Sequence, residues 1–140
     1  VEVVRAALTS EETARVVYEL AVKLGKEPVN CRDTYGFLAN RAVISENDAV
    51  ELVWAHIATP ADIDKAVRLG FNRPLGPLEL ADMIGSWGLR VHGENDRIKE
   101  FGWERGHAHP LIKLMVRAGY TGGTGKKGIY DFWKDVLSKW

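Results

Sequence analysis

Residues 58–85, ATPADIDKAVRLGFNRPLGPLELADMIG, decide the fold class of this sequence. Thr59 is a good helix N-cap residue and Pro60 suits the first helical position, so a helix is expected from Pro60 to a stop at Gly70. Pro77 and Gly85 repeat these start and stop signals around a second helix. Two successive helices joined by a short loop predict a mainly helical domain.

The helical pattern continues on both sides of this stretch. Residues 36–57, GFLANRAVISENDAVELVWAHI, predict a long helix with one apolar stripe. Another helix is expected to begin at Pro110 and stop at Gly119. The intervening segment 87–103 predicts helix interrupted by glycines, and residues 121–140 predict a Gly-rich loop, a short extended piece and a last helix.

The first 33 residues have a different pattern. Residues 1–6, VEVVRA, and 27–33, EPVNCRD, predict two short strands. Between them, residues 9–25 predict an amphipathic helix in which Thr9 and Glu12 have capping-box spacing. Two short parallel strands do not form a stable domain, so we expect residues 1–33 to be the end of a larger α/β domain and residues 34–140 to form the helical domain.

Composition narrows the class of protein. The 140 residues are 46% hydrophobic and 27% charged, which is typical of a globular chain. Nineteen basic residues balance nineteen acidic ones, so no net charge favours nucleic acid or an anionic membrane. The single cysteine, Cys31, cannot form an internal disulfide and suits a reducing cytoplasm. No apolar run approaches the roughly 18 residues of a membrane span.

Two motifs resemble ligand sites only superficially. In TGGTGKKG, residues 121–128, a P-loop would need glycine at the position of Tyr120, so a surface loop is the simpler interpretation. His107 and His109 lie two residues apart, but a zinc site needs three or four ligands. We therefore expect no metal, and we expect His109 to precede a helix that begins at Pro110.

Aromatic and amide residues leave further alternatives open. The five tryptophans can fill a core or form an interface with a second copy of the chain; they are Trp54, Trp87, Trp103, Trp133 and Trp140. In DTYGFLANR, residues 33–41, Gly36 is expected at a turn and Asn40 on the same helical face as Phe37. An asparagine on an apolar face usually has a hydrogen-bonding role, and the local sequence favours a structural one.

Six stretches in order resemble the second half of the L-3-hydroxyacyl-CoA dehydrogenases, NAD enzymes of fatty-acid β-oxidation and butyrate-type metabolism: VEVVRA, TSEET, LGKEPVNCRDTYGFLANR, ADIDKAVRLGFNRPLGPLELAD, HPLIKLMVRAGY and GIYDF. The resemblance implies an all-helical dimerisation domain of the 6-phosphogluconate-dehydrogenase C-terminal type. It also implies that residues 1–33 are the last strand-helix-strand of a Rossmann NAD-binding domain. The expected partners are an acyl-CoA substrate and a second copy of the chain, without nucleic acid or membrane.

The resemblance also assigns site residues. Glu2, otherwise simply an exposed strand acid, matches a carboxylate that hydrogen-bonds a catalytic histidine about a dozen residues upstream, outside this chain. Asn40 matches the asparagine that positions the acyl-CoA. The dinucleotide fingerprint also belongs upstream, so this chain is expected to be inactive alone and not to bind NAD through its own β-α turn.

Several positions depart from the family pattern. Tyr35 stands where proline is usual, Glu46 and Asp48 lie in a stretch that is normally less acidic, and Ser86 and Trp87 replace a Leu-Asp pair. These departures affect the turn before Asn40 and the loop after the GPLELAD motif.

The Gly-rich loop departs as well. Over residues 123–127 the family's cofactor-contacting lysine aligns with Thr124. Lys126 and Lys127 are the two alternatives for its place, and Lys126 is our candidate cofactor-binding residue.

Two alternatives remain at this point. A non-catalytic helical dimerisation or acyl-CoA-binding module would fit the altered loops. A hydroxy-acid dehydrogenase acting on a sugar acid would share the Asn40-Arg41 stretch but not GPLELAD.

Overall fold

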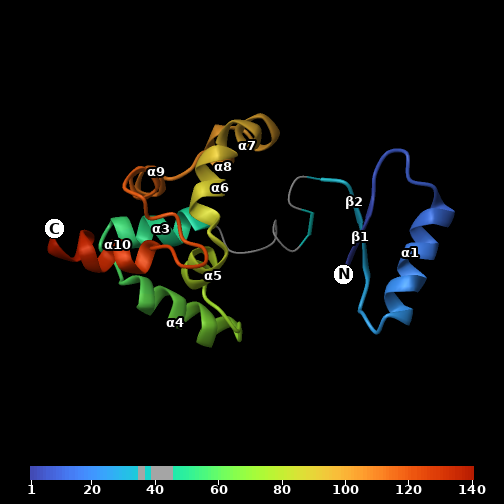
Figure 1. The fold of residues 1–140 in the computed structure, drawn as a ribbon, viewed down its shortest axis with the longest axis horizontal. Helices are drawn as coiled ribbons and strands as arrows, with labels where there is room; N and C mark the ends of the chain where they lie inside the picture. Colours follow the sequence, from blue (N-terminus) through green and yellow to red (C-terminus); the bar gives the residue numbers. More distant parts are fainter. Residues whose placement is uncertain (35–36, 39–45) are drawn as a thin grey trace. The chain divides into compact units, whose positions relative to one another are not determined.

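The computed structural model describes residues 1–34, 37–38 and 46–140 of the 140-residue chain. It forms two compact units, Val1–Val43 and Ile44–Trp140, which are drawn in Figure 1 and are described separately below. The expected domain boundary at residues 33 and 34 stays a prediction.

The first unit is the expected β-α-β arrangement. Strand β1 (Glu2–Arg5) is followed by helix α1 (Glu11–Lys23) and strand β2 (Val29–Arg32). The strands pair in parallel, with Glu2 opposite Val29 and Val4 opposite Cys31. The helix between the two strands provides the crossover connection that parallel pairing requires.

The N-terminal cap of α1 differs from the sequence expectation. Ser10 is the N-cap, and its hydroxyl accepts a hydrogen bond from the Thr13 backbone N–H at 3.0 Å. Thr9 accepts instead from the backbone N–H of Ala6 at 3.1 Å, which closes the turn before the helix. The capping box assigned to Thr9 and Glu12 was therefore wrong by one residue.

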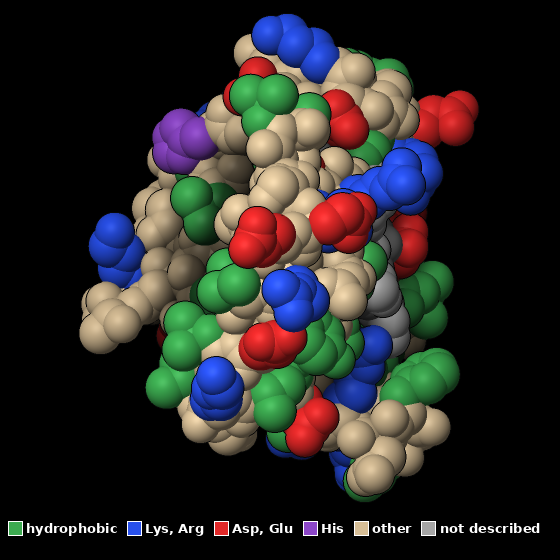
Figure 2. All heavy atoms as spheres, turned by 90° about the vertical axis from the view of Figure 1, so that its right-hand side faces the viewer, with side chains coloured by type: hydrophobic (Ala, Val, Ile, Leu, Met, Phe, Trp, Pro, Cys, Tyr) green, Lys and Arg blue, Asp and Glu red, His purple; other side chains and the backbone are tan. Residues whose placement is uncertain are grey.

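Helix α1 leaves much of its apolar face exposed. Ala21 is buried, whereas Val17, Leu20 and Leu24 are 44%, 52% and 66% exposed. A pair of short strands offers too little surface to cover such a helix. On the face shown in Figure 2, hydrophobic side chains are interspersed with acidic and basic ones.

In the described residues of the second unit, all the regular secondary structure is helical. Its elements are α3 (Glu46–Trp54), α4 (Pro60–Phe71), α5 (Pro77–Ile84), α6 (Ser86–His92), α7 (Glu94–Phe101), α8 (Trp103–Gly106), α9 (Pro110–Arg117), α10 (Ile129–Asp135) and the 3-10 helix η1 (Leu137–Lys139). The expected mainly helical fold with a small strand-helix-strand segment is confirmed.

Most of the expected helix boundaries in this unit are confirmed. Thr59 caps α4, accepting from the Asp62 backbone N–H at 3.2 Å, and Gly85 ends α5. The predicted stop at Gly70 was wrong, because α4 continues to Phe71 and ends at Asn72. Asn72 adopts a left-handed conformation with φ of 50°, which asparagine tolerates better than most residues.

The long helix expected over residues 36–57 is shorter in the described residues. Phe37 and Leu38 lie in a turn, and α3 spans Glu46–Trp54. Tyr35, Gly36 and residues 39–45 lie outside the described residues, and Asn40 is among them. The expected placement of Asn40 on the same helical face as Phe37 therefore stays a prediction.

The core of the helical unit combines side chains from nearly every helix. Trp87 at its centre is fully buried, whereas Trp54, Trp103 and Trp140 are 40%, 63% and 69% exposed and Trp133 is partly buried. Other fully buried core side chains are Val50, Val53, Leu78, Leu111, Ile112, Met115, Ile129 and Leu137. Within the described residues, no helix is both long and apolar enough to cross a membrane.

Candidate functional site

The predicted site residues do not form one described cluster. Glu2 belongs to the first unit and Lys126 to the second, while Asn40 lies outside the described residues. The catalytic roles of Glu2 and Asn40 and the cofactor role of Lys126 therefore stay predictions.

Glu2 is half-buried in β1, close to Cys31 on β2. Burial raises the pKa of the Cys31 thiol, and the negative charges of Glu2 and Asp33 raise it further. The Glu2 and Asp33 carboxylates are therefore close enough to act on a charge at Cys31. A carboxylate in such a place can orient and stabilise a cationic imidazole, which is the role expected of Glu2.

The Gly-rich loop is held against α5 by its backbone. The N–H of Gly123 donates to the backbone oxygen of Asp82 at 2.7 Å, and the N–H of Gly122 donates to the backbone oxygen of Lys127 at 2.8 Å. The N–H of Lys126 donates to the Gly123 oxygen at 3.0 Å. The loop is therefore a folded turn, as its glycines predict.

The two lysines of this loop have different surroundings. The Lys127 ammonium donates to Asp135 at 2.8 Å and lies 5.6 Å from the centre of the Tyr120 ring. Tyr120 also donates to Asp135 at 3.0 Å. Hydrogen bonds from Lys127 and then Tyr120 lower the pKa of Asp135. Lys126 is exposed and its side chain has no hydrogen bond or ion pair within the described residues, so it is the lysine available to a ligand.

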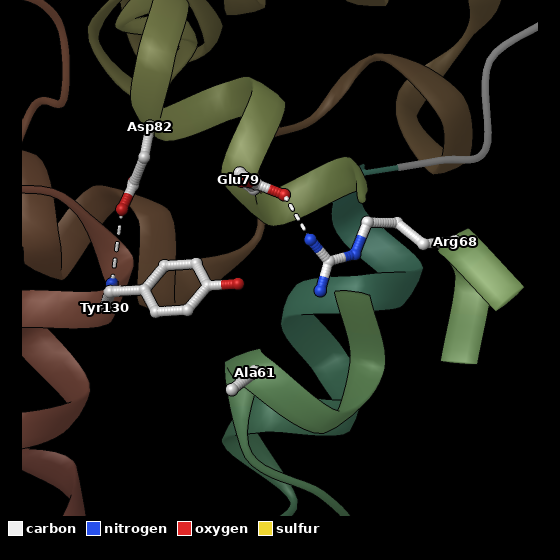
Figure 3. A pocket seen from close by; sticks show the side chains of 5 residues that line it. All are labelled: Ala61, Arg68, Glu79, Asp82 and Tyr130. Atoms are coloured by element: carbon white, nitrogen blue, oxygen red, sulfur yellow. Dashed lines mark hydrogen bonds and ion pairs between the residues drawn. The ribbon is translucent and has the colours of Figure 1, made fainter. Parts of the chain in front are cut away.

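A pocket of about 390 Å³ lies among α4, α5 and α10. Figure 3 shows the Tyr130 ring extending from α10 toward an ion pair between Arg68 and Glu79, whose charged atoms are 3.5 Å apart. Ala61 and Asp82 complete the lining. Sequence reasoning missed this pocket, because its residues come from three separate segments of the chain.

Asp64, which is hydrogen-bonded to the pocket residues Glu79 and Tyr130, is almost completely buried, with 1% exposure. Its carboxylate accepts the backbone N–H groups of Leu78 and Glu79 at 2.9 and 2.7 Å, and the Tyr130 hydroxyl at 2.5 Å. Asp64 therefore caps the N-terminus of α5, where negative charge is favourable. A Cβ atom at Gly76 would overlap the Asp64 side chain, so glycine is required there.

Asp82 provides the corresponding cap for α10. Its Oδ1 accepts the Trp87 indole N–H at 2.5 Å and the Ile129 N–H at 2.7 Å, while Oδ2 accepts the Tyr130 N–H at 3.3 Å. Burial raises the pKa of Asp82, although these hydrogen bonds oppose the change. A Cβ atom at Gly128 would overlap the carboxylate, so this close approach also requires glycine.

The two histidines of the GHAHP motif make structural contacts. Nδ1 of His109 accepts the Leu111 N–H at 3.0 Å, so its Nε2 is the donor to Glu51 at 2.6 Å. His107 stacks on the Trp103 ring with their centres 5.4 Å apart. The expectation that His109 marks a helix start is confirmed. Outside residues 35–36 and 39–45, no three His, Cys, Asp or Glu residues are grouped to hold a metal ion.

Three residues that differ from the family pattern, Glu46, Ser86 and Trp87, make contacts within the helical unit. The Ser86 hydroxyl donates to Glu46 at 2.8 Å, which joins the start of α6 to the start of α3. Trp87 fills the core and donates to Asp82. These replacements are therefore compatible with a well-packed helical unit.

Together, the fold and its two aspartate caps define an all-helical domain that is preceded in the chain by a β-α-β unit. Residues 36–132 match the family model of the 3-hydroxyacyl-CoA dehydrogenase C-terminal domain. The chain belongs to this family.

Similar proteins support the assignment along almost the whole chain. A probable 3-hydroxybutyryl-CoA dehydrogenase of Deinococcus radiodurans is 41% identical over 94% of this chain and 48% of its own length. A 3-hydroxybutyryl-CoA dehydrogenase of Clostridioides difficile is 40% identical over 94% and 47%, respectively. The crystal structure of Mycobacterium tuberculosis FadB2 has a TM-score of 0.80 and 34% identity, covering 92% of this chain and 46% of that one. The chain thus spans about half the length of the relatives it matches.

Proposed function

We propose that the chain is part of a cytoplasmic NAD-dependent 3-hydroxyacyl-CoA dehydrogenase, which oxidises an L-3-hydroxyacyl-CoA to a 3-oxoacyl-CoA. The observation that carries this proposal is the family match over residues 36–132, a range that includes Asn40. The names of the similar proteins favour 3-hydroxybutyryl-CoA as the first substrate to test. Because the chain spans about half of those relatives, the activity is proposed for the whole protein.

The proposed role of Glu2 is to orient a histidine supplied by another segment of the protein. The imidazole accepts the proton of the substrate 3-hydroxyl while the C3 hydrogen leaves as hydride and the C3–O bond becomes a carbonyl. A carboxylate that accepts the other imidazole N–H fixes the tautomer and stabilises the imidazolium. The half-buried position of Glu2 on β1, where its charge acts on Cys31 of β2, supports this assignment.

Asn40 and Lys126 are proposed to contact the two small molecules. The Asn40 amide would donate a hydrogen bond to an oxygen of the acyl-CoA, which would orient the thioester and stabilise developing charge. The exposed Lys126 ammonium would contact the cofactor through its positive charge.

The described β-α turn does not fit the cofactor phosphates. Residues 6–10, AALTS, connect β1 to α1 without a glycine, and the hydroxyls of Thr9 and Ser10 bond within the turn and the helix cap. A dinucleotide-binding turn needs glycines so that its backbone can approach the pyrophosphate. We therefore assign hydride acceptance to NAD held mainly by other parts of the protein.

The proposal is tested with the full-length enzyme, 3-hydroxybutyryl-CoA and NAD, by following NADH formation. Glu2→Gln should lower kcat by about 10²- to 10⁴-fold, because the amide cannot stabilise an imidazolium as a carboxylate does. Glu12→Gln is the matched control, since Glu12 is exposed on α1. Near-normal turnover of the Glu2 variant, with its circular dichroism spectrum unchanged, would remove Glu2 from the mechanism.

A non-catalytic acyl-CoA-binding module is the second candidate, favoured by the departures at Ser86, Trp87 and residues 123–127. Isothermal titration calorimetry distinguishes the two. Binding of acyl-CoA by the full-length protein without any NADH formation would favour the module and reject the dehydrogenase.

A further inference from the structure

Two consecutive lysines lie near the end of the Gly-rich loop, and their backbone groups close it into a turn. The Gly122 N–H donates to the Lys127 oxygen at 2.8 Å, and the Lys126 N–H donates to the Gly123 oxygen at 3.0 Å. Gly122 and Gly123 have φ of 67° and 91°, a region that glycine enters without strain. The backbone from Gly122 to Lys127 is therefore closed on itself.

One side of this turn rests on helix α5. The Gly123 N–H donates to the backbone oxygen of Asp82 at 2.7 Å. A Cβ atom at Gly122 would lie 2.8 Å from the same oxygen, so this position has no room for a side chain. The contact with α5 fixes the glycine half of the loop.

The lysine half of the loop is fixed by Asp135 of α10. The Lys127 ammonium donates to Asp135 Oδ2 at 2.8 Å, and the Tyr120 hydroxyl donates to the same oxygen at 3.0 Å. Tyr120 precedes the loop and packs edge-on against Phe132 of α10, with ring centres 5.0 Å apart. One carboxylate oxygen therefore ties the residue before the loop and a residue near its end to the same helix.

The two lysines consequently differ in the charge that they offer to a ligand. The hydrogen bond between Lys127 and Asp135 raises the pKa of the ammonium and lowers the pKa of the carboxyl, so both stay charged at neutral pH. Lys126 is exposed, and its ammonium has no hydrogen bond or ion pair within the described residues. Of the two, Lys126 has the positive charge that is not already balanced.

We propose that Lys127, Asp135 and Tyr120 are positioning residues, which hold the loop so that the neighbouring Lys126 presents its ammonium to a phosphate group of the cofactor. This inference rests on the proposed dehydrogenase function, in which Lys126 contacts NAD. The side chains of Lys127 and Asp135 are 61% and 35% exposed, and an exposed ion pair contributes little to global stability. The effect of the contact should therefore be local to the loop.

Asp135→Asn in the full-length enzyme separates positioning from simple electrostatics. Removal of a negative charge near the loop would by itself tighten the binding of an anionic cofactor. Loss of positioning should instead raise the Kd for NADH and the KM for NAD about 2- to 5-fold, the range of an exposed ion pair, with kcat nearly unchanged. NADH fluorescence measures the Kd, and NADH formation from 3-hydroxybutyryl-CoA measures KM and kcat.

Amide hydrogen exchange in the unliganded protein provides a readout apart from activity. Asp135→Asn should speed exchange at Gly122 and Lys126 about 2- to 5-fold, because these N–H groups close the turn. Lys127→Met should act in the same direction, and the double variant should be no worse than the poorer single variant, since both remove one interaction. Lys134→Met is the matched control and should change neither affinity nor exchange, because Lys134 is an exposed lysine of α10.

Lys126→Met tests the contact that is being positioned. It should raise the Kd for NADH about tenfold or more, the range of a hydrogen bond to a charged group, without faster exchange in the loop. Tighter or unchanged NADH binding by Asp135→Asn, or unchanged binding by Lys126→Met, would overturn the proposal. A wild-type protein that binds NADH but does not oxidise 3-hydroxybutyryl-CoA would reject the proposed function alone, and the binding and exchange measurements would still decide the positioning. A full-length protein that binds no NADH would overturn both.

Discussion

At the scale of single residues, the most informative positions are the two aspartates that the sequence analysis did not select. Asp64 and Asp82 look like ordinary helix acids in ADIDKAV and GPLELAD. Their partners are distant, since Tyr130 lies 66 residues after Asp64 and Ile129 lies 47 residues after Asp82. No local pattern reveals such pairs. Proline and glycine at helix ends are visible in the sequence, but the aspartate side chains that cap these ends from another helix are not.

We expect Asp64→Ala to destabilise the helical unit by about 3 kcal/mol or more, because three donors lose their buried acceptor together. Tyr130→Phe removes only one of these bonds and should cost about 1–2 kcal/mol. Urea denaturation of both variants measures the difference. Equal destabilisation by the two variants would show that the backbone bonds of Asp64 to α5 contribute little.

At the scale of elements, the proline start signals were all confirmed, whereas one glycine stop signal and one cap residue were wrong. Pro60, Pro77 and Pro110 each begin a helix as expected, since proline fixes φ and needs no intrahelical partner for its nitrogen. The stop at Gly70 failed because a glycine inside a helix is only mildly unfavourable and Asn72 could supply the left-handed turn. The cap at Ser10 could not be distinguished from Thr9 by residue type alone.

The position of Gly70 inside α4 suggests a substitution that should stabilise the helical unit. Gly70 is exposed within α4, and a Cβ atom there would meet nothing within 4 Å. Gly70→Ala should therefore raise the free energy of unfolding by about 0.5–1 kcal/mol, the difference in helix propensity. Thermal unfolding followed by circular dichroism provides the measurement. A lower melting temperature would mean that glycine has a conformational role at this position.

At the scale of the whole molecule, the sequence predicted the fold class and the family, but not the relation between the predicted site residues. Glu2 and Lys126 lie in separate compact units. A resemblance transfers a role to a position in the chain, whereas a site depends on distances between atoms. The assignment of Glu2, Asn40 and Lys126 to one catalytic site accordingly remains a proposal.

We propose that the protein is a homodimer through its helical unit. The reason is that this unit exposes large apolar side chains, which an isolated domain would usually bury. Examples are Leu69, Phe71, Met83, Ile84 and Leu89, all at least 56% exposed. Light scattering of the full-length protein should give twice the mass of one chain over a wide concentration range. A monomeric mass throughout that range would reject the homodimer.

The hydrogen bonds of Asp64 and Asp82 form a closed circuit that runs from α4 to α5, from α5 to α10, and from α10 back to α4. Its last member, Tyr130, belongs to α10, which follows α4 and α5 in the chain. During synthesis, α4 and α5 leave the ribosome long before α10 and can form only part of this circuit. The helical unit should therefore reach its final stability only after α10 has been translated, and a chain truncated before Ile129 should lose the bonds that join α10 to α4 and α5.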